Sequence, residues 1–583
     1  MTKREQIEHR YTLPVWRFYL IMGVCLLALA SLAVRAAWIQ VYDNEFLKLQ
    51  GDSRVIRYQG LNGQRGIIKD RNGVELATSI PVHSVVVDPA IIVKEYDKYP
   101  DLFESSGWLQ FASLVNKSGA QLADDIVAEA AAGKRYLFIK RHIDPTHASI
   151  ISRLKIPGIK LEEESKRFYP AGEITAHVVG FTDIDERGLE GIERAFDGRL
   201  KGEDGKRRII KDRKGNPVSP VDVLNEPQIG EELNLSIDIS IQTQAYKTLK
   251  AAVKKHRAKA GTAVVIDIDT GEVLAMVNQP SYNPNNTSSR VPNATRNRAI
   301  TDVFEPGSTV KPLTAVSALS SGEYTKNTRI NTSGMMRVGG RMVRDARDYG
   351  VMTVTEVIEK SSNIGVAKMA LSLDDETFLD SFYKVGFGSD NATGFPGETA
   401  GHLNVRRNWS DIEKATLSFG YGLDVSALQL AKAYAILGGL GKSRPVSLLK
   451  VSGPVPAKQV IDPNVASDVV EMMAQVISEE GTGNRARVDG YRVSGKTGTA
   501  RKAVSGGYGD AVFAVFAGVA PVRNPRLAVV VMIDDPPGEL YHGGEVAAPV
   551  FASIMNHSLR TLNIAPDPAD ATLLKPANMG TAE

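Results

Sequence analysis

The sequence has few of the residues that would hold a metal or a disulfide framework. Its single cysteine, Cys25, cannot form an intramolecular disulfide or a cysteine zinc cluster. The nine histidines show no H-E-x-x-H spacing, so we expect no metal and no cofactor. Lys plus Arg number 70 and Asp plus Glu 67, an imbalance too small for a dedicated nucleic-acid binder.

Long apolar runs are also scarce, and only one occurs. Phe18 to Val34 is an uncharged stretch of 17 residues between Arg17 and Arg35. At about 1.5 Å per residue it reaches the lower limit for crossing a bilayer. Basic residues are more frequent before the run than after it, which predicts a cytoplasmic N-terminus and an extracytoplasmic remainder. A cleaved signal peptide is the alternative, because Ala28-Leu29-Ala30 resembles a cleavage site.

The length of 583 residues predicts several domains. We expect a cytoplasmic tail and anchor over 1–40, and an elongated, non-catalytic α+β module over 41–230. A catalytic α/β domain follows over 231–563, in which strands from both ends of the segment enclose a helix-rich middle. The local patterns predict a turn at 212–215, a strand over 234–238, a hairpin of 263–268 with 272–277, and a strand from Tyr491. A flexible Pro- and Ala-rich tail occupies 564–583.

The first candidate catalytic element is Ser308 with Lys311, preceded by Pro306-Gly307 and followed by an apolar helical stretch. A serine hydroxyl needs a base, and a lysine is a base only when burial or a neighbouring positive charge keeps it neutral. If a helix begins at Ser308, Lys311 lies one turn further on the same face. Ser-x-x-Lys also occurs elsewhere in the chain, at Ser152, Ser381 and Ser447.

Two further elements follow in the chain. Ser361 and Asn363 supply a hydroxyl near the lysine for proton relay and an amide that can bind a peptide. Lys496, Thr497, Gly498 and Thr499 then supply a second cation, two hydroxyl donors and a glycine that permits close approach of a backbone.

Other segments match these patterns less well. Ser281-Tyr282-Asn283 precedes the nucleophile, and Ser389-Asp390-Asn391 lies in a glycine-rich loop, so Ser361 is preferred. Residues 490–497 also match the P-loop formula G-x4-G-K-[ST]. A P-loop requires a buried strand before it and a helix after it, and neither is predicted here.

The three elements in this order resemble those of the active-site serine penicillin-recognising enzymes, for which this set of motifs is already known. Further segments narrow the resemblance to the class B penicillin-binding proteins, and within them to the division-specific branch. These segments are Arg65-Gly66-x-Ile68-x-Asp70-Arg71-Asn72-Gly73, Arg167-Phe168-Tyr169-Pro170, Gly188-Leu189-Glu190, Asp212-Arg213, Phe419-Gly420-Tyr421-Gly422 and Tyr541-His542-Gly543-Gly544. The resemblance covers about residues 15 to 563.

The resemblance implies a penicillin-binding transpeptidase fold: a sheet flanked by helices, with an all-helical subdomain, after an elongated pedestal and one transmembrane helix. It implies that Ser308 attacks the D-Ala-D-Ala amide of a peptidoglycan stem peptide with Lys311 as general base. Ser361 passes the proton to the leaving amine.

Substrate-binding roles follow for the remaining motif residues. Asn363 holds the donor peptide, and Lys496, Thr497 and Thr499 bind its terminal carboxylate. The backbone N–H groups of Ser308 and Thr499 form the oxyanion hole. An amine from a second stem peptide then completes the cross-link of the septal wall, and β-lactams acylate Ser308 in the same way. The stretch 505–509 is predicted to be a mobile loop beside the site.

The resemblance also implies partners and a location. The expected partners are stem peptides, β-lactam antibiotics, a membrane-embedded glycan polymerase and other division proteins. The expected location is the inner membrane, with a single pass, a cytoplasmic N-terminus and a periplasmic catalytic domain. A binding-only relative, and a serine D,D-carboxypeptidase or β-lactamase-like hydrolase of the same fold, are the alternatives. The long N-terminal module favours wall assembly.

Overall fold

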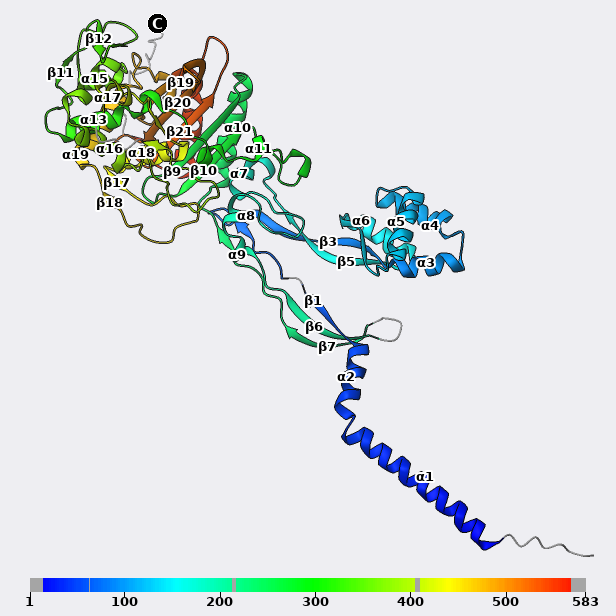
Figure 1. The fold of residues 1–583 in the computed structure, drawn as a ribbon. Helices are drawn as coiled ribbons and strands as arrows, with labels where there is room; N and C mark the ends of the chain where they lie inside the picture. Colours follow the sequence, from blue (N-terminus) through cyan, green and yellow to red (C-terminus); the bar gives the residue numbers. More distant parts are fainter. Residues whose placement is uncertain (1–13, 62, 212–216, 404–408, 568–583) are drawn as a thin grey trace, which may run out of the picture. The chain divides into compact units, whose positions relative to one another are not determined.

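A computed structural model of the chain describes residues 14–61, 63–211, 217–403 and 409–567 (Figure 1). The chain divides into two compact units. Unit 1 is drawn from Met1–Gly63 and Glu203–Gln228, and unit 2 from Gln64–Gly202 and Ile229–Glu583.

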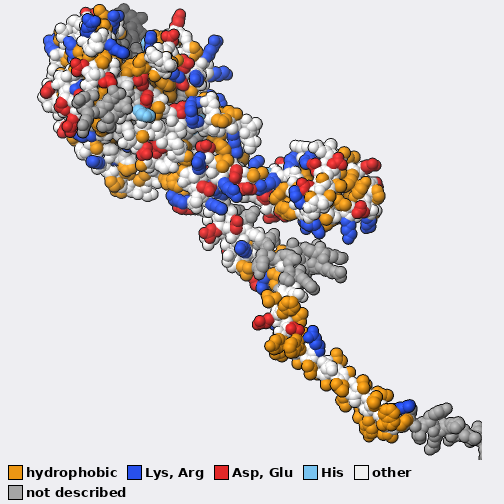
Figure 2. All heavy atoms as spheres, viewed as in Figure 1, with side chains coloured by type: hydrophobic (Ala, Val, Ile, Leu, Met, Phe, Trp, Pro, Cys, Tyr) orange, Lys and Arg blue, Asp and Glu red, His pale blue; other side chains and the backbone are white. Residues whose placement is uncertain are grey.

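Unit 1 contains the predicted anchor. The apolar run lies within α1 (Val15–Val41), a helix of 27 residues whose most apolar window has a mean hydropathy of 2.2 and is not buried. At about 1.5 Å per residue the helix is roughly 40 Å long, enough to cross a hydrocarbon core of about 30 Å. Most of its atoms in Figure 2 belong to apolar side chains. It is therefore a candidate membrane span.

The rest of unit 1 is a short helix and a small antiparallel sheet with strand order β1-β6-β7. The bounds are α2 (Asn44–Val55), β1 (Ile56–Leu61), β6 (Gly205–Lys211) and β7 (Pro217–Asn225). The predicted turn at Asp212–Gly215 lies outside the described residues.

The first part of unit 2 is built on two long antiparallel strands, β3 (Glu75–Val87) and β5 (Ile159–Phe168), paired from Thr78↔Phe168 to Val87↔Ile159. A cluster of helices packs around buried Trp108. The other elements are β2 (Ile68–Lys69), α3 (Pro89–Lys98), η1 (Leu102–Glu104), α4 (Ser106–Leu114), α5 (Gly119–Ala131), β4 (Leu137–Ile143), α6 (Pro145–Leu154), η2 (Gly172–Ile174), α7 (Ala176–Val179), α8 (Gly191–Ala195) and α9 (Asp197–Leu200).

The catalytic part of unit 2 has a five-stranded antiparallel sheet with order β10-β9-β21-β20-β19. Its strands are β9 (Ala260–Asp267), β10 (Val273–Gln279), β19 (Ser494–Val504), β20 (Gly507–Ala520) and β21 (Leu527–Asp534). Segments more than 200 residues apart are thus adjacent, because β9 pairs with β21. The predicted hairpin and the predicted closure of the sheet by distant segments are confirmed. β19 is an edge strand.

Helices cover both faces of this sheet, as Figure 1 shows. α10 (Ile239–Lys255) and α21 (Ala548–Thr561) pack together on one face, and α18 (Ala427–Gly438) contacts β9, β20 and β21. Every residue of β9 and β21 is buried, which explains their nearly continuous apolar sequence.

A helix-rich segment separates β10 from β19. Its elements are η3 (Thr287–Ser289), α11 (Pro292–Thr295), α12 (Arg298–Thr301), η4 (Gly307–Val310), α13 (Lys311–Ser320), β11 (Arg329–Asn331), β12 (Met335–Val338), β13 (Arg341–Arg344), β14 (Val351–Thr353), α14 (Val354–Glu359), α15 (Asn363–Ser372), α16 (Asp375–Lys384), β15 (His402–Leu403), α17 (Asp411–Leu417), β16 (Leu423–Asp424), β17 (Lys442–Ser443), β18 (Lys458–Gln459), α19 (Pro463–Gln475) and η5 (Asn484–Ala486). The predicted transpeptidase-type architecture of a sheet flanked by helices is confirmed, but the helix-rich segment, expected to hold an all-helical subdomain, also contains short strands.

Three local predictions differ from the structure in their bounds. The strand expected over 234–238 is reduced to β8 (Leu233–Asn234), because Asp238 instead caps α10. The strand expected from Tyr491 begins at Ser494. The loop expected over 505–509 is the tip of the β19–β20 hairpin, with Val504 paired to Gly507.

Candidate active site

The Ser308 segment forms a tight turn that leads into a helix. η4 (Gly307–Val310) is a 3-10 turn, and the backbone N–H of Lys311 donates to the carbonyl of Ser308 before α13 continues. Gly307 has a φ of +54°, a conformation that a glycine adopts without strain. The predicted one-turn spacing of Ser308 and Lys311 on a helix start is present.

Ser361 lies between two helices in an unusual backbone conformation. α14 ends just before it, and the Ser362 hydroxyl caps α15 by accepting from the Gly365 N–H at 2.9 Å. Ser361 has a φ of +61°, which is rare for a residue with a side chain and which concentrates at functional sites. Its carbonyl oxygen and its hydroxyl both face the same lysine.

Lys311 Nζ lies within hydrogen-bond distance of three oxygen atoms of this turn. Its Nζ lies 2.5 Å from the carbonyl oxygen of Ser361, 2.8 Å from Asn363 Oδ1 and 3.1 Å from Ser361 Oγ. The Asn363 amide is oriented because its Nδ2 donates to the carbonyl of Arg344 at 3.0 Å. Lys311 is fully buried at the start of α13.

Lys496 approaches the same hydroxyl from the edge strand β19. Its Nζ donates to Ser361 Oγ at 2.9 Å and to the carbonyl of Thr497 at 3.3 Å, and its side chain is fully buried. Ser361 Oγ thus lies between two lysine amines from elements far apart in the sequence.

Burial lowers the pKa of both lysine amines. It holds the pKa of Lys311 well below its usual 10.5, and the nearby positive charge of Lys496 lowers it further. Burial alone lowers the pKa of Lys496 to about 7. Asp345 opposes the shift at Lys311.

A neutral Lys311 fits the hydrogen bonds that it makes. A neutral amine has two N–H groups and one lone pair. The Ser361 carbonyl and Asn363 Oδ1 can only accept, so they use the two N–H groups. The lone pair is then free to take a proton from a hydroxyl. Ser361 Oγ, which accepts from Lys496, is one such hydroxyl.

The strand residues after Lys496 pack tightly against the Ser308 turn. A Cβ atom on Gly498 would lie 2.9 Å from the carbonyl oxygen of Pro306 and 2.9 Å from Thr309 Cγ2. The glycine therefore permits β19 to approach η4. Thr497 Oγ1 is 3.0 Å from the Thr482 hydroxyl, and Thr499 Oγ1 accepts from the Gly543 N–H at 3.1 Å.

Ser308 itself is partly exposed. Within the described residues, no hydrogen bond joins Ser308 Oγ to Lys311 Nζ, whose donors point to Ser361 and Asn363. All eight predicted site residues nevertheless come from segments that meet here: η4 with α13, the turn before α15, and β19.

The competing motifs are explained by local structure. Ser381 is buried and bonded to Ser317 and the Leu313 carbonyl, and Ser447 donates to the Leu449 carbonyl. Ser281 donates to the Glu173 carbonyl, and the backbone carbonyl of Ser389 accepts from Gln429. The P-loop match is excluded as such, because an extended strand rather than a helix follows residue 493.

Comparisons with known proteins show the family of this chain. Residues 261–556 match the family described as penicillin binding protein transpeptidase domain, and residues 61–235 match the penicillin-binding protein dimerisation domain. The chain is 44% identical over 565 residues to the peptidoglycan D,D-transpeptidase FtsI of Escherichia coli K12, covering 97% of this chain and 95% of that protein. The chain belongs to the class B penicillin-binding proteins.

Solved structures of other penicillin-binding proteins have the same fold. The transpeptidase domain of penicillin-binding protein 3 from Burkholderia pseudomallei is 43% identical, with a TM-score of 0.53, over 57% of this chain and 98% of that one. Penicillin-binding protein 3 from Mycobacterium tuberculosis, in complex with aztreonam, is 26% identical, with a TM-score of 0.66, over 88% and 98%.

Sequence reasoning missed two acidic residues of this class B penicillin-binding protein. Asp345 accepts hydrogen bonds from the Asn363 N–H, the Ile364 N–H and the Ser362 hydroxyl, and so fixes the turn that presents Ser361. No sequence pattern singles it out.

The second missed residue is Glu305, which directly precedes the Pro306-Gly307 entry. Its Oε1 accepts from the Gly422 N–H at 2.8 Å and from the Tyr508 hydroxyl at 3.0 Å, and burial raises its pKa. The Tyr508 ring meets Tyr421 edge-on at 5.1 Å. Glu305 therefore joins the nucleophile turn to the β19–β20 hairpin. Its position three residues before Ser308 is the sequence feature that could have identified it.

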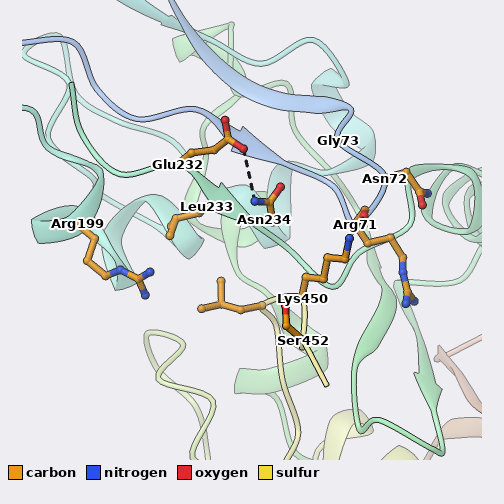
Figure 3. A pocket seen from close by; sticks show the side chains of 10 residues that line it. Arg71, Asn72, Gly73, Arg199, Glu232, Leu233, Asn234, Lys450 and Ser452 are labelled. Atoms are coloured by element: carbon orange, nitrogen blue, oxygen red, sulfur yellow. Dashed lines mark hydrogen bonds between the residues drawn. The ribbon is translucent and has the colours of Figure 1, made fainter. Parts of the chain in front are cut away.

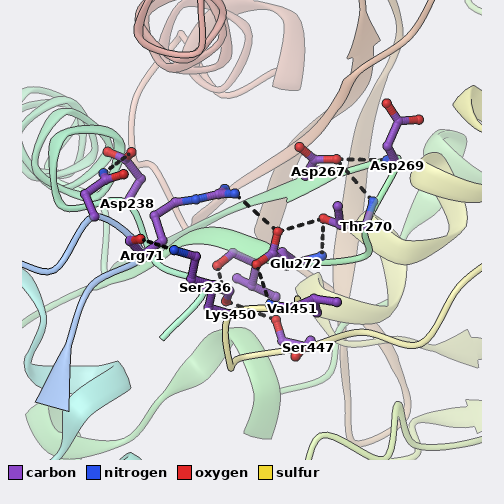
Figure 4. A network of polar contacts seen from close by, with 12 residues as sticks. Arg71, Ser236, Asp238, Asp267, Asp269, Thr270, Glu272, Ser447, Lys450 and Val451 are labelled. Carbon is purple, nitrogen blue, oxygen red and sulfur yellow. Dashed lines mark hydrogen bonds and ion pairs between the residues drawn. The ribbon is translucent and has the colours of Figure 1, made fainter. Parts of the chain in front are cut away.

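A separate pocket lies where the Asp70–Gly73 turn meets the transpeptidase domain (Figure 3). Its volume is about 760 Å³, and Arg71, Arg199 and Lys450 are among its lining residues. A polar network borders it (Figure 4): Glu272 accepts from the Arg71 guanidinium at 3.3 Å and from the Val451 N–H at 2.9 Å. No predicted site residue lines this pocket. The network fixes the N-terminal turn to the β9–β10 hairpin.

Among the described residues, no group of three or more His, Cys, Asp or Glu side chains could hold a metal ion. The buried His177 has a structural contact instead, with Nε2 at 2.8 Å from the Ala294 carbonyl.

Proposed function

We propose that this class B penicillin-binding protein is a peptidoglycan D,D-transpeptidase that cross-links stem peptides of the septal wall, with Ser308 as its nucleophile. The observation that carries the proposal is the convergence of two buried lysines, Lys311 and Lys496, on Ser361 Oγ beside the Ser308 turn. A buried pair of amines keeps one of them neutral, as a lysine base requires.

The reaction begins at Ser308. Neutral Lys311 accepts the hydroxyl proton as the oxygen attacks the carbonyl of the penultimate D-Ala, which gives a tetrahedral oxyanion. Collapse expels the terminal D-Ala, whose nitrogen receives a proton through Ser361, and leaves an ester on Ser308. The amine of a second stem peptide then attacks this ester, and the proton that it loses returns through the same groups.

The remaining residues hold the donor peptide. Lys496, Thr497 and Thr499 bind the terminal carboxylate, and Asn363 binds the peptide backbone. The N–H groups of Ser308 and Thr499 stabilise the oxyanion. As an edge strand, β19 has backbone groups available for an extended peptide, and Gly498 keeps this strand close to the nucleophile turn. β-Lactams, which penicillin-binding proteins bind, acylate Ser308 by the same route.

We further propose the domain limits and location that the sequence predicts. α1 is the single inner-membrane anchor of segment 1–40, with the N-terminus in the cytoplasm. The pedestal over 41–230 and the transpeptidase domain over 231–563 are periplasmic, and 564–583 is a tail. The anchor and pedestal contact a membrane-embedded glycan polymerase and other division proteins. The charge bias around the apolar run supports this orientation.

The test is mass spectrometry of the full-length, detergent-solubilised protein after exposure to a penicillin. We expect one acyl adduct, on the peptide that contains Ser308, and a slow loss of that adduct. Ser308→Ala should remove the adduct while the unfolding transition is unchanged, and Lys311→Ala should slow its formation by roughly 10² to 10⁴. An adduct that persists in Ser308→Ala would remove the nucleophile assignment, and rapid hydrolysis of the adduct would favour a hydrolase.

A further inference from the structure

A short hairpin beside the active site has an unusual distribution of charge. β12 and β13 pair in register from Met335↔Arg344 to Val338↔Arg341, and the two-residue turn Gly339-Gly340 has φ values of +51° and +81°. Such a turn matches the twist of the strands that it joins, so the hairpin is well defined. Figure 1 shows it among the helices of the transpeptidase domain.

One face of the hairpin is packed and the other is not. Val338 and Val343 are buried against Ile364 and Ala367 of α15. On the opposite face the cross-strand pairs are Met335 with Arg344 and Arg337 with Met342. Met335 is 58% exposed and Met342 43% exposed. The outer face therefore alternates arginine with exposed methionine, while the inner face holds the hairpin against α15.

The arginines of the hairpin have no acidic partner. Arg337, Arg341 and Arg344 are exposed, and within the described part of the chain their guanidinium groups take part in no salt bridge or hydrogen bond. The adjacent carboxylate, Asp345, is already bonded to the turn at residues 362–364. Two of these uncompensated positive charges, Arg337 and Arg344, lie on the outer face, whereas Arg341 is paired with Val338 on the other face.

The hairpin is directly connected to the catalytic residues. Asn363 Nδ2 donates to the backbone carbonyl of Arg344, while Asn363 Oδ1 accepts from Lys311. One side chain therefore links the end of β13 to the proposed base. Asn363, to which the proposed function assigns the donor peptide, therefore lies directly beside the end of β13.

We propose that the β12–β13 hairpin binds the carboxylates of the donor stem peptide that precede its D-Ala-D-Ala end. Guanidinium groups form paired hydrogen bonds with carboxylates, and the exposed methionines offer adaptable apolar contact to the aliphatic parts of the peptide. The hairpin then selects donor stems by their charge. This inference rests on the proposed function and adds that the enzyme recognises the carboxylates of the donor stem peptide.

The test measures how well two pentapeptides protect the full-length protein from labelling by a fluorescent penicillin. One ends in D-Ala-D-Ala and carries free upstream carboxylates, and the other has these groups amidated. The ratio of the two inhibition constants within one protein is the readout, so a general change in reactivity cancels. We expect the unmodified protein to prefer the acidic peptide by about tenfold at low salt, and this preference to shrink at about 500 mM salt.

The double variant Arg337→Glu/Arg344→Glu should lose or reverse the preference for the acidic peptide. The matched control is Lys247→Glu/Arg560→Glu, which makes the same change in net charge at exposed positions of α10 and α21. The control should keep the preference.

Equal protection by both peptides in the unmodified protein would overturn the proposal, as would an equal loss of preference in the control. Binding of the unmodified protein, but not the hairpin variant, to vesicles of anionic phospholipid with no peptide preference would assign the hairpin to a membrane instead. Absence of penicillin labelling in every variant would contradict the proposed function and not the hairpin alone.

Discussion

Replacing Lys496 by methionine tests whether a second charge tunes the proposed base. Lys311 Nζ and Lys496 Nζ lie 3.1 and 2.9 Å from the same Ser361 oxygen, so they are at most 6.0 Å apart, the sum of the two distances. At an effective dielectric constant of about 20, two unit charges at that separation repel by about 3 kcal/mol, which is about 2 pKa units. Methionine keeps the burial and removes the charge.

The direction of the effect follows from the role of Lys311. Acylation requires the neutral amine, so the rate rises with pH through the pKa of Lys311. Loss of the neighbouring positive charge raises that pKa, so the rising limb moves to higher pH. Because the pKa of Lys496 is itself about 7, its charge acts fully only below that pH. We therefore expect a shift of about one to two pH units.

The assay is the second-order rate constant of penicillin acylation from pH 5 to pH 10, with each variant normalised to its own plateau. Normalisation separates the pKa effect from the loss of carboxylate binding. Lys432→Met is the control, because burial also lowers the pKa of Lys432 but this lysine lies outside the site. A limb that stays in place in Lys496→Met, or that moves to lower pH, would refute the reasoning.

Three further predictions concern stability and geometry. Between pH 7 and 10 the unfolded chain binds more protons at Lys496 than the folded protein does, so a protonated Lys496 destabilises the folded state. Lys496→Met should therefore have a free energy of unfolding roughly 3 to 5 kcal/mol above that of the parent at pH 6. Denaturant unfolding should show this difference shrinking toward pH 10. Gly498→Ala should slow acylation by about 10- to 100-fold, since its Cβ would lie 2.9 Å from the Pro306 carbonyl; a normal rate would show that β19 can shift freely. Ser361→Ala should abolish efficient acylation and Ser389→Ala should not; the opposite outcome in the labelling assay would transfer the relay role to the other serine.

The sequence determined the elements whose signals are local. The apolar run of α1, the hairpin of β9 and β10 and the helix start after Pro306-Gly307 each depend on neighbouring residues alone. The order of the three motifs was also sufficient to indicate the family. The resemblance did not depend on knowing any contact between the motifs.

The tertiary structure determines the distances between these residues and their pKa values. The closeness of Lys311 and Lys496 exists only because an edge strand near residue 496 meets a turn that ends 135 residues earlier. Their low pKa values come from burial by the surrounding core, which no local pattern encodes. Asp345 has an ordinary sequence context, and its importance comes from the three hydrogen bonds that its carboxylate accepts. Local spacing chooses the chemical groups, while packing fixes their distances and their protonation, because both depend on atoms distant in the chain.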